Sequence, residues 1–395
     1  MTRVLELSAQ AAGGVRAHIR QVSQLLAKDG HQVLLAGPSN VISPADDAVG
    51  GACLRTYQIY IGARPSGADL KALRQLKQLA ATAQVIHAHG LRAGALAVLA
   101  VKRLPAAKRP RVVVTLHNLP VGSAPTRLVG QALQLVVVKG ADYVLTVSPD
   151  LLEKAKQLGL KAGEIAVVPA PARGCADCGC MDRAAQSEIS QASAQSSHAG
   201  SGVGTGSGVD SGSGYGASSD TDYDAAPCVL TIARLAPQKG LDLLLEAATL
   251  IKQRGLNFTW LVAGDGPLKA QLNQQITAAD LPVKLLGRRE DIGALLSQAD
   301  VVVQTSYWEG QPLTLREAMQ AGRAIVATDV GGSAYTLAGC GQLVEPQAGP
   351  LADAVVAVIS DPKRRETLEA ASRAAVAKIP GETQLREQLD RVLAL

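Results

Sequence analysis

Two cations in the second half of the chain are placed to bind an anion. Arg234 and Lys239 follow the apolar run of residues 228–233 and precede a helical pattern over residues 241–251, with four residues between them. Neither has an obvious acid partner close by in the sequence. Cations at the start of a helix are poorly placed for the helix dipole, so a negatively charged ligand explains them better than a local ion pair. For an isolated Arg/Lys pair, solvated surface charges are the alternative.

Two carboxylates form a second pair further along the chain. Glu309 follows the apolar run of residues 300–305 and is expected on a loop. Seven residues separate it from Glu317, which lies on a predicted helix that starts near Pro312. A carboxylate can accept hydrogen bonds from vicinal hydroxyls such as those of ribose, and the free N–H groups of a helix start can receive phosphate. Together the two pairs predict a site for a ligand that is both polyhydroxylated and phosphorylated.

Glycines occur where predicted strands turn into helices. Gly13 and Gly14 follow the first apolar run, and Gly264 and Gly266 follow another. Such turns let a ligand approach the backbone, although a tight turn without a ligand is the simpler alternative. Lys269 occupies the position of the third glycine of a dinucleotide fingerprint, so the second turn is interpreted as one that lines a cleft.

The elements that must position these residues alternate between short apolar runs and longer helical patterns, which is typical of parallel α/β sheets. Strands are predicted at VLELS, QVLLAG, QVIHAH, RVVVTLH, YVLTVS and IAVVPA in the first half, and at CVLTIAR, FTWLVAGD, VKLLG, DVVVQT and AIVATD in the second. Residues 173–227 are dense in Gly and Ser and predict a flexible linker. We therefore expect an α/β domain over residues 1–172, this linker, a second α/β domain over 228–381, and a C-terminal helix over 382–395 that packs back towards the first domain.

Composition excludes several classes of protein. The chain has 395 residues, 47% of them hydrophobic, and a formal charge of +5, which is too mild for a dedicated nucleic-acid-binding protein. No apolar run is long enough to span a bilayer and no secretory signal is recognisable, so a cytoplasmic location is expected. Six cysteines are too few for a disulfide scaffold, which fits a reducing compartment.

Two further clusters have simple explanations. Cys175, Cys178 and Cys180 could bind zinc with a fourth ligand from Cys228 or His198, but unpaired loop thiols are the favoured interpretation. A basic stretch is most simply a solvated face, although it could contact an anionic membrane if the acceptor is lipid-linked. Its members are Lys102, Arg103, Lys108, Arg109 and Arg111.

Taken together, these motifs resemble the retaining glycosyltransferases of family 4. The similarity rests on GGVRAHIRQVSQLLAKDGHQV, the strand ends HAHG and TLHN, ADYVLTVSPDLLEK, ARLAPQKG, the GDGP turn and EGQPLTLRE followed by AMQAGRAIVATDVGG. It covers nearly the whole chain apart from the linker. It implies the GT-B fold, in which two Rossmann-like domains face each other across a cleft, with the acceptor on the N-terminal side.

The resemblance also assigns roles to residues. Arg234 and Lys239 would hold the donor diphosphate and stabilise its developing charge, Glu309 would contact the transferred sugar, and Glu317 would bind the ribose hydroxyls. His117 would face the donor sugar or the acceptor, and His89 fits the same pattern less securely. Further donor contacts are expected from Gly13, Gly14, Gly264, Gly266, Gly310, Gln311, Pro312 and Leu313.

The implied reaction moves a sugar from a nucleotide-diphosphate sugar to a glycan, lipid or small-molecule acceptor, with no bound metal and no cofactor beyond the donor. Three alternatives stay open: a GT-B sugar-nucleotide epimerase or phosphorylase-like enzyme, a dinucleotide-dependent oxidoreductase, and a non-catalytic nucleotide-sugar-binding protein on the same scaffold. The oxidoreductase lacks the expected G-x-G-x-x-G turn with an acid about 20 residues later.

Overall fold

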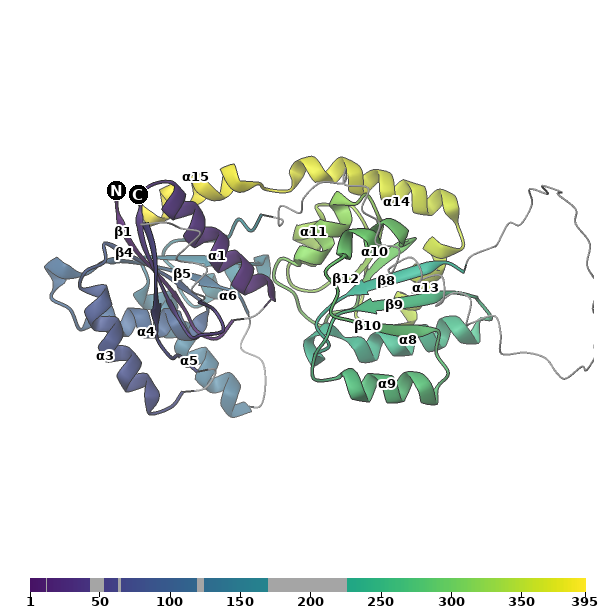
Figure 1. Ribbon diagram of the computed structural model, residues 1–395, viewed down its shortest axis with the longest axis horizontal. Helices are drawn as coiled ribbons and strands as arrows, with labels where there is room; N and C mark the ends of the chain where they lie inside the picture. Colours follow the sequence, from purple (N-terminus) through teal and green to yellow (C-terminus); the bar gives the residue numbers. More distant parts are fainter. Residues whose placement is uncertain (12, 43–52, 63–64, 119–123, 170–225) are drawn as a thin grey trace, which may run out of the picture.

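The structure is a computed structural model that describes residues 1–11, 13–42, 53–62, 65–118, 124–169 and 226–395. These residues form two α/β domains, each built on a parallel sheet (Figure 1). Most of the predicted linker over residues 173–227, with Cys175, Cys178, Cys180 and His198, lies outside the described residues.

The N-terminal sheet has the strand order β3-β2-β1-β4-β5-β6-β7, and every neighbouring pair is parallel. Its strands are β1 (Arg3–Ser8), β2 (Gln32–Gly37), β3 (Leu54–Gln58), β4 (Val85–His89), β5 (Arg111–Leu116), β6 (Tyr143–Thr146) and β7 (Gly163–Ile165). Its helices are α1 (Gly13–Lys28), α3 (Ala68–Ala80), α4 (Leu91–Lys102), the short 3-10 helix η2 (Ala106–Lys108), α5 (Ala124–Gly140) and α6 (Pro149–Gln157).

The C-terminal sheet has the order β10-β9-β8-β11-β12-β13 and is also parallel throughout. Its strands are β8 (Cys228–Ile232), β9 (Thr259–Ala263), β10 (Val283–Gly287), β11 (Val301–Gln304), β12 (Ala324–Thr328) and β13 (Gln342–Val344). Its helices are η4 (Pro237–Lys239), α8 (Leu241–Gln253), α9 (Lys269–Ala278), α10 (Ile292–Gln298), α11 (Leu313–Gln320), α12 (Ser333–Leu337), α13 (Ala348–Ile359), α14 (Pro362–Ala375) and η5 (Val376–Lys378).

Each sheet is covered on both faces, because alternate residues of a strand point to opposite sides. In the N-terminal domain, Leu5 and Leu7 pack with the helices α3, α4 and α5, whereas Val4 packs with α1, α6 and the C-terminal helix. In the C-terminal domain, α8, α9 and α13 cover one face and α10, α11, α12 and α14 cover the other. The predicted fold class is therefore confirmed.

The last helix, α15 (Glu382–Leu393), packs on the N-terminal domain although it follows the C-terminal one in sequence (Figure 1). Leu385 and Leu389 are buried in the same cluster as Ile19 of α1. Arg386 forms an ion pair with Asp29, at 2.8 Å. The helix thus ties the two domains together independently of the segment that joins β7 to β8.

Three strands differ from the sequence prediction. β3 and β13 were not predicted, and both are edge strands with half-exposed residues, so neither forms an apolar run. The strand predicted at IAVVPA is instead the short β7, which begins at Gly163 and ends at Ile165. Val167 is outside β7 because its N–H donates to the side chain of Gln388 on α15, at 2.7 Å.

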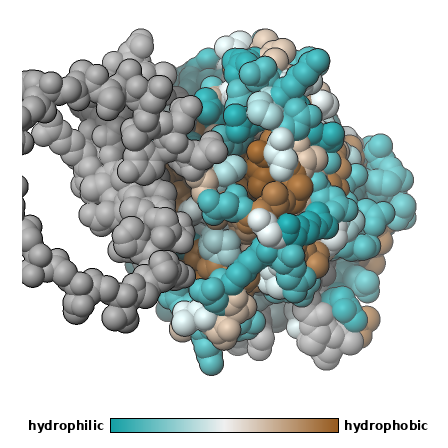
Figure 2. Space-filling view, turned by 90° about the vertical axis from the view of Figure 1, so that its right-hand side faces the viewer, coloured by the Kyte–Doolittle hydropathy of each residue, from teal (hydrophilic) through white to brown (hydrophobic). Residues whose placement is uncertain are grey.

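Within the described residues, no helix is both long enough and apolar enough to cross a bilayer. On the face at the far end of the C-terminal domain, hydrophilic residues surround a smaller apolar area (Figure 2).

Candidate active site

The two sheets present their carboxyl ends to a common cleft between the domains. In each sheet the strand order reverses beside the first strand, between β1 and β4 and between β8 and β11, and ligands of open α/β sheets bind at such points. The cleft encloses about 2230 Å³ and is lined by both domains. This exceeds the roughly 300–1,000 Å³ of a pocket for one small ligand, so the cleft can hold two substrates.

Lys239 and Glu309 meet in this cleft. Lys239 ends the 3-10 helix η4 after β8, and Glu309 lies in the loop after β11. Lys239 Nζ is 2.5 Å from Glu309 Oε1, which also accepts a hydrogen bond from Ser306, at 2.6 Å. The acid partner that the local sequence did not offer to Lys239 therefore comes from the neighbouring strand. This ion pair holds the two side chains together in the cleft.

Arg234 and Glu317 also line the cleft, from different elements. Arg234 follows β8 and is exposed, whereas Glu317 lies on α11 and keeps only 6% of its surface exposed. The structure therefore brings together all four residues of the two charged pairs. Arg288 and Arg289, which follow β10, also line the cleft, and Arg289 forms an ion pair with Asp291, at 2.6 Å.

Gln311 forms two hydrogen bonds that its position in the sequence does not suggest. Its amide nitrogen donates to the carbonyl of Ala166 in the N-terminal domain, at 2.7 Å, and its amide oxygen accepts from the buried Arg316, at 2.5 Å. The amide nitrogen thus crosses to the other domain, while the amide oxygen is held by α11 of its own domain. Gln311 contributes to the cleft wall, while its polar atoms link α11 to the other domain.

The other predicted loop residues pack across the domain boundary. Leu313 begins α11 and would lie 3.2 Å from a Cβ at Gly14, and a Cβ at Gly310 would touch Val147 at 2.5 Å. Gly13, Gly14, Gly310, Pro312 and Leu313 all line the cleft. Gly13 has φ +56°, a conformation that favours glycine at the start of α1.

The turn after β9 requires glycine at two positions. Gly264 has φ +152°, and a Cβ there would overlap the carbonyl oxygen of Ala233. A Cβ at Gly266 would overlap the backbone of Leu235 in the same way. Gly264 lines the cleft, whereas Gly266 packs behind it against the loop that carries Arg234. The turn therefore supports that loop from below.

We expect Gly264→Ala to lower the free energy of unfolding by more than about 2 kcal/mol, because it adds backbone strain and a steric clash. Gly293→Ala is the matched control, since Gly293 lies in α10 and a Cβ there meets no atom within 4 Å. Denaturant titration of both variants measures the difference. Equal stabilities would contradict this account of the turn.

Four of the six histidines, His18, His87, His89 and His117, gather with Glu6 on the N-terminal side of the cleft. Register places Glu6 of β1 opposite His87 of β4. Glu6 and both β4 histidines share the sheet face that α1 covers, and His18 lies on α1.

Hydrogen bonds connect this histidine cluster. Glu6 Oε1 is 3.1 Å from His87 Nδ1, and Glu6 Oε2 is 2.7 Å from His89 Nε2. His89 Nδ1 is 3.3 Å from His117 Nε2. His18 lies edge-on to the rings of His89 and His117, at centroid distances of 6.1 and 6.0 Å. His18, His89 and His117 all line the cleft.

Burial keeps the cleft histidines neutral. Desolvation is the main cause that lowers the pKa of His18 to about 3 and that of His89 to about 4, and it holds the pKa of His117 well below its ordinary value. Repulsion between the rings acts in the same direction. For Glu6, burial raises the pKa, but the adjacent histidines outweigh it and lower the pKa to about 2. The cluster therefore contains a buried carboxylate together with the neutral rings of His18, His89 and His117.

Glu6, His87 and His89 also have the composition of a metal site, with ligand atoms within 4.8 Å of one another. Each carboxylate oxygen, however, lies at hydrogen-bond distance from one ring nitrogen. We therefore interpret the group as a hydrogen-bonded cluster. Of its members, sequence reasoning identified only His117 and, less securely, His89.

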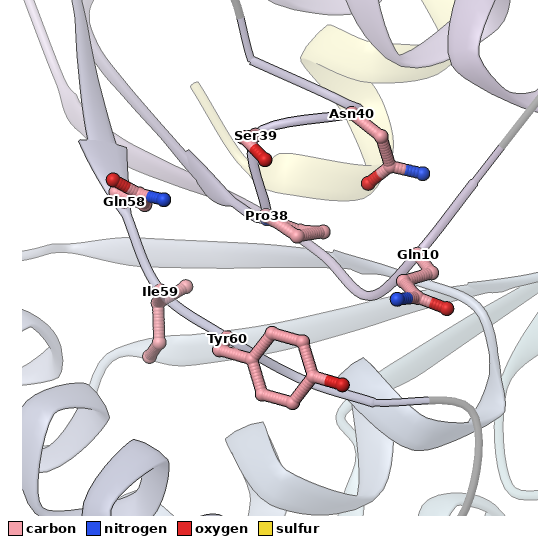
Figure 3. A pocket seen from close by; sticks show the side chains of 7 residues that line it. All are labelled: Gln10, Pro38, Ser39, Asn40, Gln58, Ile59 and Tyr60. Atoms are coloured by element: carbon pink, nitrogen blue, oxygen red, sulfur yellow. The ribbon is translucent and has the colours of Figure 1, made fainter.

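A smaller polar recess of about 270 Å³ adjoins the main cleft. Its walls come from residues after β1 and β2 and from the end of β3, and Gln10 and Asn40 are shared with the cleft (Figure 3). Tyr60 stands at its edge with 58% of its surface exposed. The recess offers uncharged amides and an aromatic ring beside the cleft.

Comparison with known proteins gives two family matches. Residues 13–171 match the model described as glycosyl transferase 4-like domain, and residues 226–361 match the model described as glycosyl transferases group 1. Together the two models cover both domains.

Curated relatives match shorter segments. The alpha-D-kanosaminyltransferase of Streptomyces kanamyceticus is 34% identical over 152 residues, which is 37% of this chain and 39% of that protein. The N,N'-diacetylbacillosaminyl-diphospho-undecaprenol alpha-1,3-N-acetylgalactosaminyltransferase of Campylobacter jejuni is 40% identical over 111 residues, 28% of each chain. The chain thus spans well under half the length of these relatives.

Solved structures match over the full length. Anabaena Alr3699/HepE in complex with UDP and glucose superposes with a TM-score of 0.73, at 19% identity and 100% coverage of both chains. Sucrose-phosphate synthase from Thermosynechococcus elongatus gives a TM-score of 0.73 at 20% identity, covering 100% of this chain and 98% of the other. At these identities the likeness concerns the fold.

Proposed function

Because the chain belongs to the group 1 glycosyltransferases and has their GT-B fold, we propose that it transfers a sugar from a nucleotide-diphosphate sugar to an acceptor bound on the N-terminal side of the cleft. The transfer retains the anomeric configuration and needs no bound metal. The observation that carries this proposal is the meeting of Arg234, Lys239, Glu309 and Glu317 in one interdomain cleft.

Each of these residues is assigned to a different part of the donor. Arg234 and Lys239 bind the diphosphate and stabilise the charge that develops on it as the glycosidic bond breaks. Glu317 accepts hydrogen bonds from the ribose hydroxyls, and Glu309 receives hydroxyls of the transferred sugar once the donor phosphate takes its place beside Lys239. The donor phosphate itself accepts the proton of the acceptor hydroxyl. This division is supported by the position of all four side chains along one cleft.

A nucleotide-sugar screen tests the proposal directly. UDP-, GDP- and ADP-sugars are compared by thermal shift and by slow hydrolysis of the donor, beginning with UDP-glucose. One donor that stabilises the protein and is hydrolysed supports the transferase. Stabilisation without hydrolysis or transfer would favour a non-catalytic nucleotide-sugar-binding protein, and no response to any donor would contradict the proposal.

Glu317→Ala is expected to weaken nucleotide binding about tenfold to a hundredfold, the range for loss of hydrogen bonds to a charged group. Glu366→Ala on α14 is the matched control, because Glu366 is exposed and lies outside the cleft. Isothermal titration with the nucleoside diphosphate measures both. Unchanged affinity in Glu317→Ala would show that this carboxylate does not bind ribose.

The acceptor could be lipid-linked, which would bring the protein to the inner face of a membrane. Lys102, Arg103, Lys108 and Arg109 are exposed around η2 and could contact anionic headgroups. Arg111 is engaged elsewhere, because its Nε donates to the carbonyl of Val392 in α15, at 2.9 Å. Co-sedimentation with anionic and with neutral vesicles tests this contact.

A further inference from the structure

The hydrogen bonds of the histidine cluster have a direction. An ionised carboxylate only accepts hydrogen bonds, so the ring nitrogens that face Glu6 must carry hydrogens: Nδ1 of His87 and Nε2 of His89. A neutral imidazole has one N–H, so Nδ1 of His89 is left with its lone pair. That atom faces Nε2 of His117, which must therefore donate.

The rule that a neutral imidazole has one N–H also determines the state of Nδ1 of His117. Since Nε2 donates to His89, a neutral His117 carries a lone pair on Nδ1. Among the described residues no side chain or backbone group is hydrogen-bonded to this atom, and His117 lines the cleft with 7% of its surface exposed. The hydrogen-bond chain that begins at Glu6 thus ends as an acceptor beside the substrates.

We propose that Glu6 and His89 are positioning residues that hold His117 in the tautomer with hydrogen on Nε2, so that its Nδ1 accepts a hydrogen bond from a sugar hydroxyl in the cleft. A neutral ring with a free lone pair suits a reaction in which positive charge develops on the transferred sugar. A positively charged imidazolium would repel that charge. The role in transfer rests on the proposed function, whereas the tautomer itself does not.

The hydrogen bond between His87 and Thr115, which does not lead to His117, provides a control. His87 Nε2 lies 2.8 Å from Thr115 Oγ1, on the side of the ring away from Glu6. Thr115→Val removes this bond at the same depth in the core and leaves the path from Glu6 through His89 to His117 intact. Glu6→Gln acts on that path, because an amide has one acceptor oxygen for two ring N–H groups and also donates.

Long-range ¹H–¹⁵N spectra of histidine-labelled protein, read at pH 7, test the tautomer without any substrate. In the wild-type protein His89 and His117 are expected to carry hydrogen on Nε2 alone. In Glu6→Gln the His117 signals are expected to shift towards a mixture of tautomers, whereas in Thr115→Val they stay in place. His117 found with hydrogen on Nδ1, or as an imidazolium, in the wild-type protein would overturn the proposal.

Kinetics then test the consequence. Glu6→Gln is expected to lower kcat about twofold to tenfold, as for the loss of one neutral hydrogen bond, with donor KM nearly unchanged. Equal effects in Thr115→Val would show general loosening of the cluster and count against positioning. A zinc ion that co-purifies with the protein would also overturn it, since a metal would reorganise the hydrogens. If no donor is turned over, the proposed transferase function fails, but the spectra still test the tautomer of His117. The two proposals can therefore be contradicted independently.

Discussion

Replacement of Lys239 by alanine is expected to reduce kcat roughly 10²–10³-fold, the effect of removing one group that stabilises developing negative charge. Donor affinity is expected to fall less, by about tenfold, because only interactions that strengthen in the transition state act fully on the rate. Arg234 also lines the cleft and, in the proposed donor complex, would still bind the diphosphate. Steady-state kinetics and donor titration separate the two quantities.

Lys269→Ala is the matched control for this variant. Lys269 begins α9, close to the cleft, and its contact with Asp265 is exposed, so its loss should leave kcat within about twofold. Loss of Lys239 also removes the ion pair that holds Glu309, whose carboxylate would keep only the Ser306 hydroxyl. The melting temperature must therefore be compared first. Wild-type kcat in a well-folded Lys239→Ala protein would remove this lysine from the catalytic site.

The four charged residues that line the cleft could be selected from sequence because the members of each pair are close together in the chain. Arg234 and Lys239 flank one loop, and Glu309 and Glu317 belong to one loop and the following helix. Strands buried on both faces are apolar throughout, so the loops at their ends stand out. The fold class followed from the same alternation of short apolar runs and helices.

The histidine cluster could not be predicted in the same way. Glu6 is a single carboxylate inside an apolar strand, and its partners lie 81 and 83 residues away. Only the register that pairs Glu6 with His87 shows that the two share a sheet face. The one available signal was the spacing of His87 and His89, which places both on one side of a strand.

Contacts between the domains were hidden for a related reason. Gln311 follows a glycine at a helix start, where sequence favours a ligand contact, yet its amide binds Ala166 of the other domain. Trp308 likewise donates to Asp150 on α6, at 2.9 Å. The way in which two domains pack together produces no periodic pattern in the sequence of either domain. Residues that join the domains are therefore recognised only in the three-dimensional structure.

The histidine cluster also predicts that the protein loses stability in acid. His18, His89 and His117 have a lower pKa in the folded protein than the ordinary value of 6.5, so below about pH 6.5 the unfolded chain binds more protons than the folded one. Their contribution to stability is complete above pH 6.5 and is lost as the pH falls towards the folded values. The lowered pKa of Glu6 acts in the same direction below pH 4.5.

The expected size follows from proton counting. Near pH 5, unfolding should take up about two to three protons at these rings, so the free energy of unfolding should change by roughly 3–4 kcal/mol per pH unit. The neighbouring charged groups do not reverse the sign. Glu6 raises the pKa of His18 and His89, but burial and the other rings outweigh it, and Arg316 on α11 lowers that of His18 further.

Thermal and denaturant unfolding between pH 5 and pH 8 measure this slope. His18→Phe should reduce the number of protons taken up on unfolding by about one, and with it the slope. The reason is that one neutral ring no longer becomes protonated when the chain unfolds. A stability that is flat from pH 7 to pH 5 would mean that these rings are hydrated or charged in the folded protein. That result would also weaken the case for a neutral His117 in the cleft, because the burial that depresses its pKa is the same burial that makes unfolding take up protons.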